Sequence, residues 1–123
     1  MPFKLNHLHV KTQDPQKTVK WWVENFGAKS VSESATSGST IQIDLHGIRM
    51  NVSPFVEGQN RPQRYGLEHI AISVPVADLN NVLSKLKTNG ARLLEESTNP
   101  RTGRKVCFVE TPDGVQVEIM GEG

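Results

Sequence analysis

The 123-residue chain contains an internal repeat, which constrains its fold more than any other feature of the sequence. The segment LNHLHV at 5–10 aligns with LEHIAI at 67–72. Each segment is followed by a helical pattern that ends in Gly-Ala and a basic residue, and each half closes with a tight turn and a short alternating strand. A sequence unit that occurs twice predicts one structural unit that is used twice.

Each half is predicted to contain one amphipathic helix. The first begins with Asp14 as N-cap and Pro15 at the first helical position, and it ends at Gly27. Its apolar residues recur at helical spacing: Val19, Trp22, Val23 and Phe26. Trp21 lies off this stripe and is either exposed or packed against a partner subunit. The second helix runs from about Asp78 to Asn89, with an apolar stripe formed by Leu79, Val82, Leu83 and Leu86.

Alternating segments predict strands in the remainder of each half. Besides the two repeated segments, they cover 28–34, 40–45, 48–53, 91–97, 104–111 and 115–120. We therefore expect an α+β fold of two βαβββ modules that form a curved mixed sheet. The chain is read as a single domain, with module one at about 1–53, a polar surface linker at 54–66 and module two at about 67–123.

Composition excludes several classes of protein. A net charge of +1 without a basic stripe argues against nucleic-acid binding, and no run of about 18 apolar residues could span a membrane. Cys107 is the only cysteine, so neither an intramolecular disulfide nor a cysteine-based zinc cluster is expected. We expect this thiol to be buried and inert. The N-terminal residues do not resemble a signal peptide, and we expect a cytoplasmic protein.

The histidines are placed by strand alternation, because strand residues two apart share a face. His7 and His9 lie opposite the apolar residues of their strand, and His69 holds the place of His7 in the second half. In the last strand Glu118 lies on the side that does not face the helix. Two imidazoles and a carboxylate form a common ligand set for divalent metals. Any one of them alone could be a solvated strand residue, but the repeat of His7 at His69 favours a ligand role.

These features resemble the vicinal oxygen chelate superfamily, which includes glyoxalase I, methylmalonyl-CoA epimerase, extradiol dioxygenases and fosfomycin or bleomycin resistance proteins. The resemblance is carried by the two histidine strands, the paired modules and the closing segment TPDGVQVEI at 111–119. It implies a glyoxalase-like cup that holds a metal bound by the first and last strands of each module. It implies His7, His69 and Glu118 as ligands, with Asn51 at the fourth place, where relatives carry a carboxylate or Gln. Asn51 could ligate through its carbonyl, act through water or leave the position open.

The reaction that we favour on this resemblance is metal-assisted proton transfer next to a carbonyl of a small substrate, with Zn, Ni, Co, Mn or Fe(II) as the divalent ion. Glu118 is one candidate base. His9 has no repeat partner and is a second, because an imidazole exchanges protons near neutral pH; it could equally line the pocket. Glu33 is a third, from its rough correspondence to a glutamate of the epimerases, although a solvated strand position explains it as well.

Positive side chains offer candidate contacts to an acidic substrate. Arg49 shares a face with Asn51 and is the foremost of them. Arg61, Arg64, Arg101, Arg104 and Lys105 are assigned a solvated surface position by default, and His46 a place in a turn. Two alternative functions remain open: an extradiol-type Fe(II) dioxygenase, and a non-catalytic small-molecule binding or resistance protein. The resemblance also implies a homodimer, with the cup built within one chain or across two.

Overall fold

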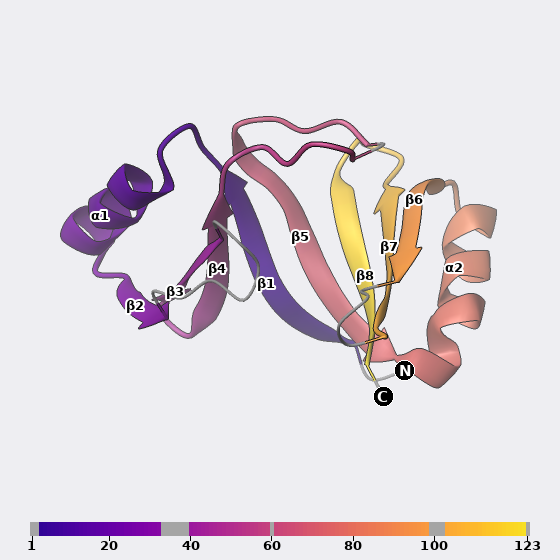
Figure 1. The fold of residues 1–123 in the computed structure, drawn as a ribbon. Helices are drawn as coiled ribbons and strands as arrows, with labels where there is room; N and C mark the ends of the chain where they lie inside the picture. Colours follow the sequence, from indigo (N-terminus) through magenta and orange to yellow (C-terminus); the bar gives the residue numbers. More distant parts are fainter. Residues whose placement is uncertain (1–2, 33–39, 60, 99–102, 123) are drawn as a thin grey trace. The chain divides into compact units, whose positions relative to one another are not determined.

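The computed structural model describes residues 3–32, 40–59, 61–98 and 103–122 (Figure 1). In chain order its elements are β1 (Lys4–Lys11), α1 (Pro15–Phe26), β2 (Lys29–Ser32), β3 (Ile41–Leu45), β4 (Ile48–Ser53), β5 (Gly66–Pro75), the 3-10 helix η1 (Val76–Asp78), α2 (Leu79–Thr88), β6 (Arg92–Thr98), β7 (Lys105–Glu110) and β8 (Gln116–Glu122). The predicted α+β class and the strand–helix–strand–strand–strand order of each half are confirmed. Neither described α-helix is long and apolar enough to cross a membrane.

The chain divides into two compact units, whose boundaries fall inside strands β1 and β5. One unit runs from His7 to Glu68, and the other contains the residues up to Asn6 and those from His69 onward. In the unit that contains His69 and the residues after it, Asn6 Nδ2 donates a hydrogen bond to Ser73 Oγ at 3.0 Å. The first residues of β1 thus pack with the second half of the chain.

In the unit from His7 to Glu68, the strands lie in the order β2-β3-β4-β1. β2, β3 and β4 pair antiparallel, whereas β4 and β1 pair parallel. Buried apolar side chains form the core of this unit: Val10, Ala28, Ile41, Ile43, Met50 and Val52. Val19 and Trp22 of α1 pack against this core, but Val23 and Phe26 stay 39% and 53% exposed. The apolar stripe of α1 is therefore covered over only part of its width.

Both ends of α1 lie where the sequence predicts them. The Asp14 carboxylate accepts a hydrogen bond from the backbone N–H of Lys17 at 3.2 Å, and Gly27 adopts a left-handed conformation with φ of 73°. His46, in the predicted turn, also has a positive φ of 53°, and its Nε2 lies 2.7 Å from the carbonyl oxygen of Phe26. The first helix is thus closed by local signals and by one side chain from the β3–β4 turn.

In the other unit the strand order is β5-β8-β7-β6, with β5 and β8 parallel and the remaining pairs antiparallel. Figure 1 shows α2 beside β6. The core comprises Val74, Leu79, Val82, Leu83, Cys107, Val109 and Ile119. The apolar faces of β5 and β8 supply Val74 and Ile119, so the helix packs on the predicted side of the sheet. Cys107 is fully buried, as expected.

The segment between β4 and β5 is only partly the surface linker that the sequence predicts. Its ends are exposed, with the rings of Phe55 and Tyr65 stacked at 4.3 Å. Arg61, however, is 5% exposed, and its Nη1 lies 2.7 Å from Oε1 of Glu68, which is 1% exposed. The expectation of a solvated Arg61 is therefore wrong. A guanidinium can be buried only against a partner such as this carboxylate, which periodicity alone does not reveal.

Candidate functional site

The polar face of the unit from His7 to Glu68 is built by β1 and β4. These strands run parallel with His9 opposite Asn51 and Lys11 opposite Ser53. Because side chains of paired positions stand on the same side of a sheet, this register gathers the polar residues of both strands on one face. His7 is buried, and its ring lies 5.9 Å from that of His9 between centroids.

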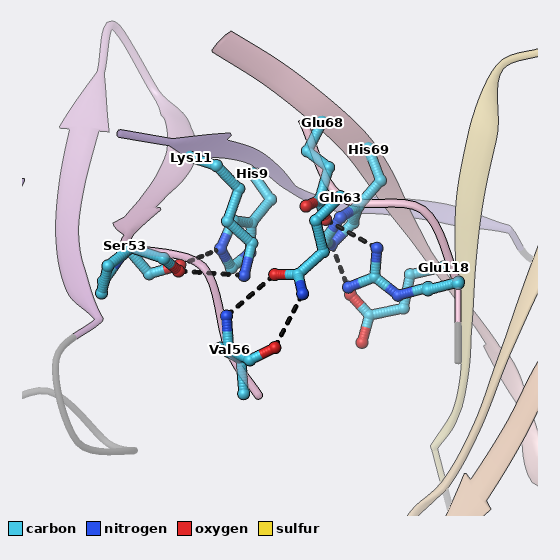
Figure 2. A network of polar contacts seen from close by, with 10 residues as sticks. His9, Lys11, Ser53, Val56, Gln63, Glu68, His69 and Glu118 are labelled. Atoms are coloured by element: carbon cyan, nitrogen blue, oxygen red, sulfur yellow. Dashed lines mark hydrogen bonds and ion pairs between the residues drawn. The ribbon is translucent and has the colours of Figure 1, made fainter. Parts of the chain in front are cut away.

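His9 is held by a serine that the sequence analysis did not single out. Its Nε2 lies 2.8 Å from Oγ of Ser53, which is 1% exposed (Figure 2). A hydroxyl can donate to a ring nitrogen or accept from it, so this contact fixes the orientation of the imidazole and biases its tautomer. The ring is half-buried, which leaves it accessible to a small molecule.

Asn51 presents an orphaned acceptor on the same face. Its Oδ1 is buried and has no hydrogen-bond partner among the described residues. A buried amide oxygen without a partner costs free energy, on the order of 1–3 kcal/mol. Such an atom in a native structure points to an absent water, ligand or ion.

In the other unit, β5 and β8 bring a histidine and a carboxylate together. His69 is 3% exposed, and its Nε2 lies 3.1 Å from Oε1 of Glu118 (Figure 2). The register places Glu118 beside Ala71 on β5 and beside Phe108 on β7. The Phe108 ring stands edge-on to the imidazole of His69, with centroids 5.1 Å apart and planes at 89°. The two polar groups therefore meet beside an aromatic ring.

Lys11 is a buried cation on the polar face of β1. It is 2% exposed, and its Nζ donates a hydrogen bond to the carbonyl oxygen of Pro54 at 3.2 Å. Burial lowers the pKa of this ammonium, the Arg61 charge lowers it further, and the Glu68 carboxylate opposes both effects. Figure 2 shows the Lys11 and His9 side chains extending from the same strand toward Ser53.

The remaining predicted residues lie in different settings. Arg49 is half-buried, and its Nη1 donates a hydrogen bond to Oε1 of Gln42 on the neighbouring strand at 3.0 Å. Glu33, the third candidate base, lies outside the described residues, as does Arg101. Burial raises the pKa of the Cys107 thiol, with the Glu96 carboxylate adding to the effect.

Two of the residues that sequence reasoning missed carried a usable signal. Ser53 follows Asn51 by two positions and Lys11 follows His9 by two, so alternation alone assigns them to the polar face. Phe108 required the register of the β7–β8 pair, which no single strand reveals.

Each unit carries donor side chains of the kinds that bind divalent metals. They offer two imidazole nitrogens, from His7 and His69, the Glu118 carboxylate and the unsatisfied Asn51 oxygen. Nitrogen and oxygen ligands of this kind suit Zn, Mn, Fe, Co and Ni. The orphaned oxygen of Asn51 is the observation that favours a ligand over an ordinary polar surface.

Comparison with known proteins matches nearly the whole length of the chain to one family. The model of the Glyoxalase/Bleomycin resistance protein/Dioxygenase superfamily matches residues 4–119. Glyoxalase I of Saccharomyces cerevisiae is 24% identical over 146 residues, with 94% of this chain spanning only 44% of that protein. Hypothetical protein BH1468 from Bacillus halodurans C-125 has a similar structure, with a TM-score of 0.72, 19% identity and coverage of 100% of this chain and 96% of that one. The structure of methylmalonyl-CoA epimerase from Mycobacterium tuberculosis gives a TM-score of 0.66 at 17% identity, covering 97% and 87%. The chain belongs to the glyoxalase/bleomycin resistance protein/dioxygenase superfamily.

Proposed function

We propose that the protein is a divalent-metal-dependent enzyme of the glyoxalase or epimerase type, which transfers a proton next to a carbonyl of a small substrate. The observation that carries the proposal is the approach of His69 Nε2 to Glu118 Oε1 at 3.1 Å, both on the polar face of their unit. A nitrogen and a carboxylate oxygen paired in this way offer two ligands of different type to one ion. Likeness to glyoxalase I supports the same reaction class.

His7, His69 and Glu118 would hold the ion, with Asn51 available as a fourth ligand. Two neutral imidazoles and one carboxylate would leave a divalent ion with about one unit of positive charge. When bound, such an ion acts as a Lewis acid that stabilises negative charge on a substrate oxygen. The neutral Asn51, in place of a carboxylate, preserves that charge.

His9 is assigned as the base that removes the proton next to the substrate carbonyl, and Glu118 is the alternative base. Ser53 Oγ lies 2.8 Å from His9 Nε2, so the hydroxyl orients the imidazole and can exchange a hydrogen bond with it. General acid–base catalysis of this kind contributes about 10²–10⁴-fold. Glu33 stays a candidate from the sequence alone.

Metal content tests the first part of the proposal. The protein is purified without a histidine tag and its metals are measured by mass spectrometry, alongside His7→Ala and His69→Ala. We expect a stoichiometric divalent metal that both variants lose. His46→Ala is the matched control, because His46 serves the end of α1 and should leave the metal content unchanged. A protein that stays metal-free after reconstitution with Zn, Mn, Fe, Co and Ni would overturn the proposal and favour a non-catalytic binding protein.

Solvent exchange tests the reaction class. The metal-loaded protein is incubated in D₂O with a panel of α-hydroxycarbonyl compounds and thioesters, and deuterium at the α-carbon is followed by NMR. His9→Ala should slow exchange by about 10²-fold or more if His9 is the base. Absence of exchange across the panel, together with oxygen uptake by the Fe(II)-loaded protein on catechols, would instead identify an extradiol-type dioxygenase.

A mixing experiment tests whether the ligands come from one chain or two, provided that light scattering first gives the expected homodimer. His7→Ala and His69→Ala proteins are unfolded together, refolded and assayed for metal. If each ion takes His7 from one chain and His69 from its partner, mixed dimers regain one complete set of ligands. If both histidines belong to one chain, mixing restores nothing.

A further inference from the structure

Lys11 is a buried charge for which the proposed reaction has no use. Lysine is almost never fully buried unless it is paired, yet Lys11 is 2% exposed. Within the described part of the chain it forms no ion pair, and the one hydrogen bond from its Nζ goes to the Pro54 carbonyl oxygen. The Glu68 carboxylate, whose charge Lys11 feels, is bonded to Arg61 at 2.7 Å.

The internal repeat indicates that the fold does not require this lysine. In the second half the corresponding position is Ser73, two residues beyond Ala71 just as Lys11 lies two beyond His9. Ser73 is also buried, at 6% exposure, and its hydroxyl accepts a hydrogen bond from Asn6. A small neutral residue therefore completes the same strand position in the second module.

The position of Lys11 connects it to the proposed base. Lys11 and His9 share a face of β1, where neighbouring positions on one face are about 7 Å apart. Ser53 stands opposite Lys11 in the parallel register and contacts His9 through its hydroxyl. Lys11 also lines an open hollow of about 410 Å³ together with Thr12 and Tyr65.

We propose that Lys11 binds an oxyanion group of the substrate, a carboxylate or a phosphate, while His9 acts on the neighbouring carbon. The substrate class is then a small carbonyl compound that carries an acidic group. An ammonium has three N–H donors, and an anion would use those that Pro54 leaves free through charge-assisted hydrogen bonds. The role in catalysis rests on the function proposed above, whereas the anion site itself requires only Lys11.

Anion binding to the metal-free, full-length protein provides the test. Pyruvate and inorganic phosphate are titrated separately at constant ionic strength, and amide shifts of the ¹⁵N-labelled protein report on residues around β1 and Pro54. We expect saturable binding of at least one probe, weakened tenfold or more in Lys11→Met and retained in Lys11→Arg. Lys20→Met is the control, because the Lys20 side chain is 75% exposed and Lys20 does not line the hollow beside Lys11. The probe that binds more tightly identifies the acidic group.

Three results would overturn the proposal. They are the absence of saturable binding by either probe, equal binding to wild type and Lys11→Met, and unfolding of both Lys11→Met and Lys11→Gln. The last would make Lys11 a structural cation. Because no metal is present, the outcome is separate from that of the proposed function. A protein that binds no metal in any assay but still binds the anion would refute the proposed metalloenzyme and leave the anion site in place.

Discussion

Replacing Arg61 by Met tests whether the segment between β4 and β5 is locked by a buried ion pair. Arg61 Nη1 and Glu68 Oε1 are 2.7 Å apart, and the two side chains are 2% and 0% exposed. The chain also contains a pair of nearly equal length, Arg92 Nη2 to Glu110 Oε1 at 2.8 Å, with side chains 71% and 30% exposed. The two pairs therefore differ mainly in burial.

Burial fixes the expected magnitudes. Removing one partner of a buried ion pair leaves an uncompensated charge and costs about 3–5 kcal/mol. Removing one partner of an exposed pair costs about 0–1 kcal/mol, because water solvates the remaining charge. Against a total stability of about 5–15 kcal/mol, Arg61→Met should thus be severely destabilising and Arg92→Met close to neutral.

Equilibrium unfolding in urea measures the free energy of unfolding of both variants. The transition is monitored by circular dichroism and by the fluorescence of Trp21 and Trp22, which lie in the same unit as Arg61. The double variant Arg61→Met with Glu68→Leu should recover much of the loss, because an apolar pair of similar volume replaces a buried ion pair at little cost. If Arg61→Met loses no more than Arg92→Met, the guanidinium is solvated and the reasoning from burial is refuted.

Three further predictions concern single side chains. Asp14→Ala should lower the free energy of unfolding by about 1 kcal/mol through loss of the α1 cap; an unchanged urea midpoint would contradict this. Cys107 should react with a thiol reagent only on unfolding, since burial raises its pKa, and rapid labelling of the native protein would disprove its burial. The pKa of Lys11 in the folded state lies below its ordinary value of 10.5, so between the two values the unfolded chain binds more protons. The contribution of Lys11 to stability should therefore rise with pH through that window in wild type and not in Lys11→Met, and parallel urea midpoints for the two proteins would refute it.

Local signals predicted the parts of the fold that local interactions determine. The span of α1 follows from a cap at Asp14, an apolar spacing of helical period and a left-handed turn at Gly27, all of which are confirmed. Alternation likewise assigned the helix-facing side of β5 and β8, where Val74 and Ile119 join the core beneath α2.

The features that local signals missed depend on contacts between distant residues. In the sequence, Arg61 is one of several polar residues in a segment that contains Pro and Gly. The burial of Arg61 is explained only by its ion pair with the buried Glu68. The sequence predicts one apolar face on α1, yet Phe26 stays 53% exposed, and the partly buried apolar residues of α1 that pack against the core are Val19 and Trp22. Helical periodicity shows which residues share a face of the helix, but it does not show how much of that face the sheet covers.

The two halves are most informative where they differ. His7 and His69 occupy the same place in the repeat, as two ligands of one kind of ion would. Two and four positions further on, the first half carries His9 and Lys11, whereas the second carries the buried Ala71 and Ser73. The second half thus completes this strand face with small side chains, and the first half places an imidazole and an ammonium there. In the reaction that we propose, a substrate would lose one proton and bind through one acidic group, so the base and the cation would each be needed once. A repeated histidine beside an unrepeated pair is the pattern expected of a duplicated fold that binds one metal and one asymmetric ligand.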